Sequence, residues 1–170
     1  MFWKNPRLWR VIRIAIPLLL TLLWLGFVFG NSLKDAAASS EQSSRVHEIV
    51  NEVASSIGIK EPISEHTVRD MAHFIEFAVL AALLCLDLWG FGTVSLQKDT
   101  RKNLLWMALA LPTCSLLAYL DEYLQTFSEG RGRDFLDVLI DTAGAAIGVA
   151  GFMALFLLTR LAITKKKNRT

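Results

Sequence analysis

The sequence predicts an all-α fold: a polytopic membrane helix bundle of four transmembrane helices, with an outer amphipathic helix between the first and the second. Composition is one reason, because 53% of the 170 residues are hydrophobic and the mean hydropathy is +0.40, too apolar for an ordinary soluble domain. Another is that four apolar segments approach or reach the ~20 residues that a helix needs to cross the hydrocarbon core. They cover residues 14–30, 71–89, 104–120 and 138–158. A backbone in lipid must bond to itself, and no run alternates as a strand would, so we expect helices.

Basic residues are distributed unevenly along the chain, although its net charge is only +2. Twelve of the 18 Lys and Arg residues precede the first span, join the second to the third or follow the fourth, and six lie on the opposite side. The positive-inside rule then places both termini in the cytoplasm. We expect residues 1–170 to form a single multi-pass domain. We also expect its first helix to stay uncleaved, although Ala36–Ala38 imitates the end of a secretory signal.

Residues 31–70 form the longest polar segment, which lies on the outer side in this topology. A serine-rich stretch comes first, and apolar residues at helical spacing follow it. These apolar residues are Val46, Ile49, Val50, Val53 and Ile57. The pattern predicts a short amphipathic helix that ends near Gly58. Such a helix could rest on the membrane surface as a connector or cover a pocket as a lid.

Several residues predict how the spans begin, bend and pack. Ser64 is a candidate N-cap for a helix that continues into the second span. Pro112 should kink the third span or loosen its hydrogen bonding. Gly144, Gly148 and Gly151 give the fourth span the small-residue spacing that lets another helix approach closely. This spacing indicates packing rather than function.

Polar and ionisable side chains gather where three of the predicted spans meet the outer water. They are His73 and Glu76 at the start of the second span, Asp121, Glu122 and Gln125 at the end of the third, and Asp134, Asp137 and Asp141 leading into the fourth. An aspartate at the centre of a bilayer costs roughly 2.5–3.5 kcal/mol on insertion scales. The spacings of three and four residues place the members of each group on one helix face. We therefore expect them to converge on an outward-facing polar pocket.

Some of these residues also have a plainer interpretation. Asp134 and Asp137 could cap the fourth helix and complement its dipole, and His73 could be a buried imidazole with a satisfied partner. The acids at the end of the third span could be solvated at a loop edge. Glu76 and Asp141 are harder to explain in this way, because apolar residues surround each of them in the sequence. Their joint placement with the others favours the pocket.

Four elements of the sequence follow one another in an order typical of a known family. They are Ser32-x-Lys34 with Ser39 and Ser43, the run from Arg69 to Phe77, Asp121-Glu122-x-x-Gln125-x-Phe127-x-x-Gly130-Arg131, and Asp134-x-x-Asp137-x-x-x-Asp141-x-x-Gly144. These elements resemble the VanZ-like family of small bacterial membrane proteins over about residues 31–151. Arg69 would take the place of the basic residue that the family has before its histidine.

The VanZ-like family is named for a member that lowers susceptibility to the glycopeptide teicoplanin. The resemblance therefore implies a role in the bacterial cell envelope and a location in the cytoplasmic (inner) membrane. It does not imply a particular reaction.

Binding of an anionic envelope ligand is the first functional hypothesis. Arg131 and Arg133 carry planar guanidinium groups that match phosphate or carboxylate oxygens, and they precede a helix N-terminus, which favours anions. Gln125, Asp134 and Asp137 would complete this ligand-binding site. The partner would be a membrane lipid, a lipid-linked cell-wall precursor or a glycopeptide. We expect no nucleic acid as a partner.

The same cluster leaves two alternatives open. One is a membrane-embedded enzyme that acts on a phosphate-bearing lipid by acid–base or metal chemistry. Its catalytic residues would be His73, Glu76, Glu122 and Asp141. A divalent cation would be its cofactor, with His73, Glu76, Glu122, Asp137 and Asp141 as candidate metal ligands. The other alternative is a non-catalytic structural protein in which the polar residues hold short helices together.

Overall fold

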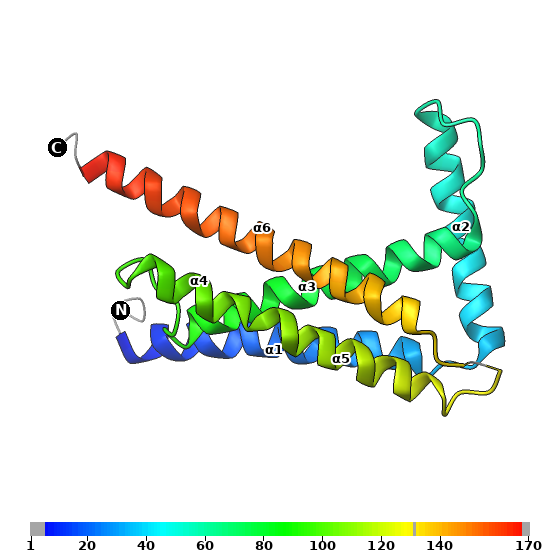
Figure 1. Cartoon of the computed structure of the whole chain (residues 1–170), viewed down its shortest axis with the longest axis horizontal. Helices are drawn as coiled ribbons and strands as arrows, with labels where there is room; N and C mark the ends of the chain where they lie inside the picture. Colours follow the sequence, from blue (N-terminus) through cyan, green and yellow to red (C-terminus); the bar gives the residue numbers. More distant parts are fainter. Residues whose placement is uncertain (1–5, 131, 168–170) are drawn as a thin grey trace.

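The computed structural model describes residues 6–130 and 132–167, with the backbone alone at residues 36–38. Within these residues the chain forms six α-helices and no strand. The helices are α1 (Pro6–Ser32), α2 (Ala36–Ser56), α3 (Glu65–Gly90), α4 (Thr100–Ala108), α5 (Ala110–Gln125) and α6 (Phe135–Lys167). The predicted all-α fold, with its extra helix between the first and second spans, is confirmed (Figure 1).

Four helical stretches are long and apolar enough to cross a membrane: α1, α3, α4 with α5, and α6. Each contains one predicted apolar segment and extends past both of its ends. Large apolar side chains are exposed on their outer faces, among them Leu19, Leu23 and Leu155. Such a surface is favourable in lipid and unfavourable in water. The chain is therefore a multi-pass membrane protein.

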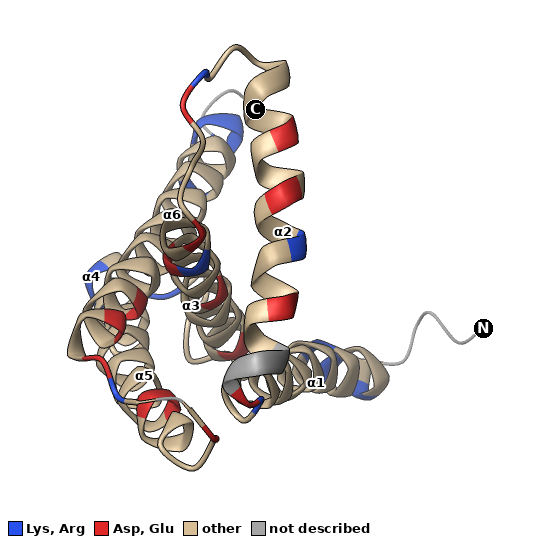
Figure 2. Ribbon diagram, turned by 90° about the vertical axis from the view of Figure 1, so that its right-hand side faces the viewer, with Lys and Arg blue, Asp and Glu red and all other residues tan. Residues whose placement is uncertain are grey.

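α3 is the central helix of the bundle. It packs most extensively against α6, and it also contacts α1, α2 and α5. Figure 2 looks onto the end of the bundle where α2 lies and shows α3 between α1 and α6. The apolar core includes Phe77, Leu80 and Cys85 of α3, Met107 of α4, Cys114 of α5 and Ala145 of α6. The other helices are therefore arranged around α3.

α6 approaches α3 most closely at two glycines. A methyl group on Gly144 would lie 2.1 Å from the carbonyl oxygen of Phe74, and one on Gly148 would lie 2.1 Å from that of Ala78. A side chain of any size would push the two helices apart at these points. The predicted packing role is confirmed for these two residues. At Gly151, by contrast, no described atom outside the adjoining stretch of α6 lies within 4 Å of the corresponding position.

Two local predictions are also confirmed. The Ser64 hydroxyl accepts a hydrogen bond from the Thr67 amide at 3.1 Å and caps the start of α3. The third span is interrupted at Leu109, between α4 and α5. Pro112 explains this break, because it has no N–H to donate to the carbonyl of Ala108 and its ring crowds that carbonyl.

α2 runs crosswise to the long helices at one end of the bundle (Figure 1). It begins at Ala36, well before Val46, the first residue of the apolar pattern that predicted this helix. The serine-rich stretch is thus helical as well. Alanines at its start have the highest helix propensity, and serines are tolerated where a helix face meets water or a cavity. The helix ends at Ser56, close to the predicted end at Gly58, which has a positive φ of 92°.

The C-terminal half of α2 is tied to the connector that precedes α3. The Asn51 side chain accepts a hydrogen bond from the Ile63 amide at 2.8 Å and donates one to the Ile63 carbonyl at 3.2 Å. His47 Nε2 lies 2.8 Å from the same carbonyl. These contacts fix the angle at which α2 crosses the bundle.

The start of α1 and the end of α6 lie at the end of the bundle opposite α2 (Figure 1). Acidic residues gather at the α2 end on α3, α5 and α6 (Figure 2). Both ends of the described chain are therefore on one side and the acidic cluster on the other. That the side with the chain ends faces the cytoplasm stays a prediction.

Candidate functional site

A histidine and two aspartates from three different helices meet near the α2 end of the bundle. They are His73 of α3, Asp121 of α5 and Asp141 of α6, and each has a nitrogen or oxygen atom within 4.8 Å of such an atom on the other two. His73 Nδ1 lies 3.5 Å from Asp141 Oδ1. Both aspartates have no exposed surface, and 12% of the His73 side chain is exposed. We call these three residues the His–Asp–Asp cluster.

The close approach of α6 to α3 brings two members of this cluster together. Gly144 packs directly on the backbone of Phe74, the residue after His73. Asp141 precedes Gly144 by three residues, so it lies on the same face of α6, about one turn toward the α2 end. The glycine thus places the Asp141 carboxylate beside the His73 ring.

Asp121 is held by the end of α1. The Ser32 hydroxyl donates a hydrogen bond to Asp121 Oδ1 at 2.5 Å, and the Ser32 carbonyl accepts one from the Ser128 hydroxyl at 3.2 Å. All three side chains are buried. These contacts join the end of α1 to the end of α5 and orient the Asp121 carboxylate.

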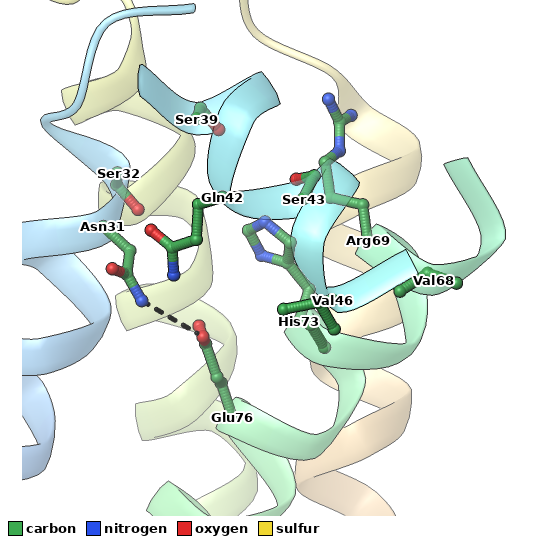
Figure 3. A pocket seen from close by; sticks show the side chains of 11 residues that line it. Asn31, Ser32, Ser39, Gln42, Ser43, Val46, Val68, Arg69, His73 and Glu76 are labelled. Carbon is green, nitrogen blue, oxygen red and sulfur yellow. Dashed lines mark hydrogen bonds between the residues drawn. The ribbon is translucent and has the colours of Figure 1, made fainter. Parts of the chain in front are cut away.

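Glu76 belongs to a neighbouring polar group on the α1 side. Asn31 Nδ2 donates a hydrogen bond to Glu76 Oε1 at 3.4 Å. Lys34 Nζ donates to Asn31 Oδ1 at 2.8 Å and to Gln42 Oε1 at 2.5 Å, which links α1 to α2. Figure 3 shows the Glu76 side chain pointing toward Asn31 and Gln42. Trp24 Nε1 donates to the Glu76 carbonyl at 2.9 Å and completes this contact between α1 and α3.

Several polar atoms of the site are buried without a hydrogen-bond partner among the described residues. They are both carboxylate oxygens of Asp141, Nδ1 of His73 and Nε of Arg69. Buried polar groups are otherwise paired in the great majority of cases, because an unpaired one costs free energy. Ionisable groups at membrane depth that keep such atoms are candidates for function rather than for packing.

A small cavity of about 90 Å³ lies between α2 and the cluster. Since a water molecule takes up about 30 Å³ in the liquid, this cavity has room for a few waters. Residues from α1, α2 and α3 line it. They include Asn31 and Ser32, then Ser39, Gln42, Ser43 and Val46, and finally Arg69, His73 and Glu76 (Figure 3). The N-terminal half of α2 therefore covers this cavity, which favours the lid interpretation over that of a simple connector.

A larger cavity of about 550 Å³ lies beside the first. The serines of α2, the first turns of α3 and the residues that precede α6 form its walls. It is lined by Ser39, Ser40, Ser43, Glu65, His66, Arg69, Gln125, Gly130, Gly132, Arg133, Asp134 and Asp137. Arg69 lines both cavities, and one of its guanidinium nitrogens lies 3.3 Å from the buried carboxylate of Asp137.

Arg133 lines the larger cavity as well, but its guanidinium group stacks on two exposed tyrosines of α5. Its Cζ atom lies 5.0 Å from the centre of the Tyr119 ring and 5.7 Å from that of Tyr123. Cation–π contacts of this kind hold the charge against the outer face of the bundle. Arg131, the other predicted ligand-binding arginine, lies outside the described residues.

Glu122, Gln125 and Asp134 form a third group, which closes the connection between α5 and α6. Glu122 Oε2 accepts a hydrogen bond from the Asp134 amide at 2.8 Å, and the Gln125 side chain donates to Glu122 Oε1. Asp134 Oδ1 accepts a bond from the Leu136 amide at 2.8 Å, as expected for a residue that caps α6. In the structure these contacts join Asp134, just before α6, to the last turn of α5.

The structure thus distributes the predicted site residues over neighbouring groups. It brings His73 and Asp141 together, pairs Asp137 with Arg69, and places Glu76 with Asn31. Their roles in binding or catalysis stay predictions.

Asp121 was expected in the polar pocket from its place at the end of the third span, but not as a catalytic, ligand-binding or metal-ligating residue. Ser32 was expected only as part of the serine-rich element. For Asn31 the sequence held no signal at all.

This arrangement supports three kinds of chemistry. An anionic group in the larger cavity could accept hydrogen bonds from Arg69 and from the serine hydroxyls of α2. His73 lies at the wall of the smaller cavity beside Asp141, where it could act as an acid or a base toward a bound group. An imidazole with two carboxylates also suits a divalent cation.

A family model described as VanZ/LLP1 matches residues 17–158, which include the His–Asp–Asp cluster, most of α1 and α6, and all of α2 to α5. No curated protein and no solved structure matches the chain.

Proposed function

The chain belongs to the VanZ/LLP1 family, and on this basis we propose that it is a cell-envelope protein that binds an anionic, phosphate-bearing lipid or a glycopeptide at the α2 end of its helix bundle. In this proposal the α2 end faces the outside of the bacterial cytoplasmic membrane. The uneven distribution of Lys and Arg residues supports that orientation. The observation that carries the proposal is the larger cavity beside Arg69.

The size and lining of this cavity suit a polar headgroup. Its volume of about 550 Å³ falls within the range of roughly 300–1,000 Å³ for small-molecule sites. Three serine hydroxyls and two arginines lie in its walls as hydrogen-bond donors. Phosphate and carboxylate oxygens accept bonds from both kinds of donor, and an arginine can offer two parallel ones.

Arg69 is the residue best placed to contact such a ligand. Its contact with Asp137 fixes one end of the guanidinium group at 3.3 Å. Its Nε atom has no hydrogen-bond partner among residues 6–130 and 132–167. The Asp137 carboxylate thus orients the Arg69 side chain. The Nε–H group of Arg69 stays available to donate a hydrogen bond to a ligand.

The surroundings of Arg133 support a lipid as the ligand. Tyr119 and Tyr123 are exposed beside it on α5, and Phe127 follows at the end of that helix. Exposed tyrosines on membrane helices prefer the depth of the lipid headgroups. A lipid lying against α5 would therefore bring its headgroup close to the cavity.

Thermal unfolding of the purified full chain in a neutral detergent tests this function. Phosphatidic acid or phosphatidylglycerol should raise the melting temperature more than phosphatidylcholine with the same acyl chains. Teicoplanin, added in place of lipid, distinguishes a glycopeptide ligand from a lipid one. Arg69→Gln should abolish most of the shift, and Arg69→Lys should retain part of it, because lysine keeps the charge without the planar fork.

Arg45→Gln is the matched control, because Arg45 is an exposed arginine of α2 that pairs with Glu41 outside the cavity. It should leave the shift intact. Equal stabilisation by all headgroups, or an unchanged shift in Arg69→Gln, would contradict the proposed function.

One observation also favours a second candidate, an enzyme that acts on a phosphate-bearing lipid. His73 lines the smaller cavity and lies 3.5 Å from Asp141, so it could accept a proton from a water molecule that attacks a bound phosphate ester. The phosphorus–oxygen bond to the lipid would then break, and the protonated imidazole could return the proton to the oxygen of the departing lipid alcohol. Release of inorganic phosphate from phosphatidic acid by the wild-type chain, and its loss in His73→Gln, would support this activity.

A further inference from the structure

We propose that the His–Asp–Asp cluster binds a divalent transition-metal cation such as Zn²⁺ or Mn²⁺, with His73, Asp121 and Asp141 as its protein ligands. This metal site goes beyond the proposed binding of an anionic ligand. The three residues lie where α3, α5 and α6 meet, whereas the anionic ligand would contact Arg69 in the larger cavity. The protein could therefore lose metal binding and still bind the anionic ligand, or lose the anionic ligand and still bind the metal.

The distances in the cluster are close to those of a metal site. Ligand atoms bound to zinc at about 2.0–2.2 Å lie roughly 3–3.6 Å from one another. His73 Nδ1 and Asp141 Oδ1 are 3.5 Å apart, which already satisfies this geometry. One nitrogen or oxygen atom from each of the three residues lies within 4.8 Å of those from the other two, and a bound cation would draw these atoms together.

The charge around the cluster favours a bound cation. Asp141 is fully buried, and neither of its oxygens has a hydrogen-bond donor among the described residues. The ion pair that the structure shows for Asp141 is with His73, which also serves as the second ligand. Glu76 lies three residues after His73 on α3, on the same face of that helix. Several carboxylates thus surround one imidazole where the dielectric is low, and a divalent cation would neutralise two negative charges.

The ligand types point to a transition metal rather than to Mg²⁺ or Ca²⁺. Imidazole nitrogen suits Zn²⁺, Fe²⁺ and related ions, whereas sites of Mg²⁺ and Ca²⁺ consist of oxygen ligands. The Ser32 hydroxyl, which donates to Asp121 Oδ1 at 2.5 Å, would orient that ligand as outer partners do in metal sites. Because His73 also lines the smaller cavity, a water molecule there could fill the open coordination position.

Metal content of the untagged, full-length protein tests this site. The protein would be purified in detergent, treated with a chelator, incubated with ZnCl₂ or MnCl₂ and passed through a desalting column. Inductively coupled plasma mass spectrometry should then find about one metal ion per chain. Asp141→Asn and His73→Gln should weaken binding by more than the roughly 10–100-fold that residues outside the coordination sphere contribute.

Asp87→Asn is the matched control. Asp87 is also a buried aspartate of a membrane-spanning helix, but it lies at the other end of α3, where it accepts a hydrogen bond from Thr21 at 2.8 Å. It should retain metal like the wild type. Circular dichroism of each variant checks that it is folded. A wild-type chain that retains no metal, or folded Asp141→Asn and His73→Gln variants that bind as tightly as the wild type, would overturn the proposal.

Discussion

Individual hydrogen bonds between residues near the helix ends hold the polar end of this bundle together. Ser32 makes two of them, since its hydroxyl donates to Asp121 and its carbonyl accepts from Ser128. The residue is almost fully buried, with 2% of its surface exposed. A hydroxyl in this position gives a buried carboxylate a donor that no solvent molecule can easily replace.

Ser32→Ala should therefore destabilise the protein. Removal of one partner of a buried hydrogen bond costs about 1–3 kcal/mol, because the other partner stays desolvated. Thermal unfolding in detergent should show a clear fall in the melting temperature. Ser55→Ala is the control, since the Ser55 hydroxyl is exposed and donates to the Glu52 carbonyl of its own helix. Equal melting temperatures for the two variants would show that the Ser32 hydroxyl does not stabilise Asp121.

Part of the candidate site could be predicted from single residues and part could not. His73 and Asp141 are predictable neighbours, because both are ionisable and lie at the same depth in two apolar segments. The contacts of Asn31 and Ser32 were not predictable. They depend on which helices are adjacent, and a polar residue at the end of a span is ordinary whether or not it has a partner.

At the scale of helices, the pairing of α3 with α6 depends on two glycines. Gly148→Ala should destabilise the bundle, because its methyl group would lie 2.1 Å from the Ala78 carbonyl oxygen and the backbone would have to move. Overpacking of this kind typically costs about 1–3 kcal/mol. Thermal unfolding in detergent measures the effect.

Gly151→Ala provides a control on the same helix. It should be neutral or slightly stabilising, because there is open space at that position and alanine favours helix over glycine. If both variants were equally stable, α6 would not contact α3 through Gly148 as the structure shows.

The sequence predicted the C-terminal part of helix α2 but not its start. Its apolar spacing from Val46 predicted a helix, but the serines before it resembled a loop, because serine competes with the backbone for hydrogen bonds. In the structure, Ser39 and Ser43 line the cavities of the polar end. Contacts with α3 and with Lys34 make the helical conformation favourable there, and a sequence pattern does not contain those contacts.

For the whole molecule, the orientation in the membrane can be tested with introduced cysteines. The native Cys85 and Cys114 are buried and would first be replaced by alanine. A cysteine at Ser55, exposed on α2, should react with an impermeant thiol reagent in intact cells. One at Lys98, between the second and third spans, should react only after the cells are permeabilised. The reverse labelling pattern would place the polar end in the cytoplasm and contradict an envelope function.

The overall architecture was largely predictable because it follows from length and polarity. A helix that crosses lipid needs about 20 apolar residues, and four such segments were visible in the chain. The central position of α3 was not predictable, since an apolar helix face can meet lipid or another helix equally well. The surroundings of Arg133, a predicted ligand-binding residue, were not predictable either. Its stacking on Tyr119 and Tyr123 is a tertiary contact, which the sequence alone does not reveal.

Susceptibility of whole cells to teicoplanin most directly tests whether the polar end of the bundle is a functional site rather than packing alone. Bacteria that express the wild-type chain should be less susceptible than cells with an empty vector. Asp141→Asn and Glu76→Gln keep shape while removing charge, so they should abolish this protection at normal membrane abundance. Asp87→Asn should preserve it. Full protection by the Asp141→Asn and Glu76→Gln variants at normal abundance would contradict a functional site and leave helix packing as the role of these residues.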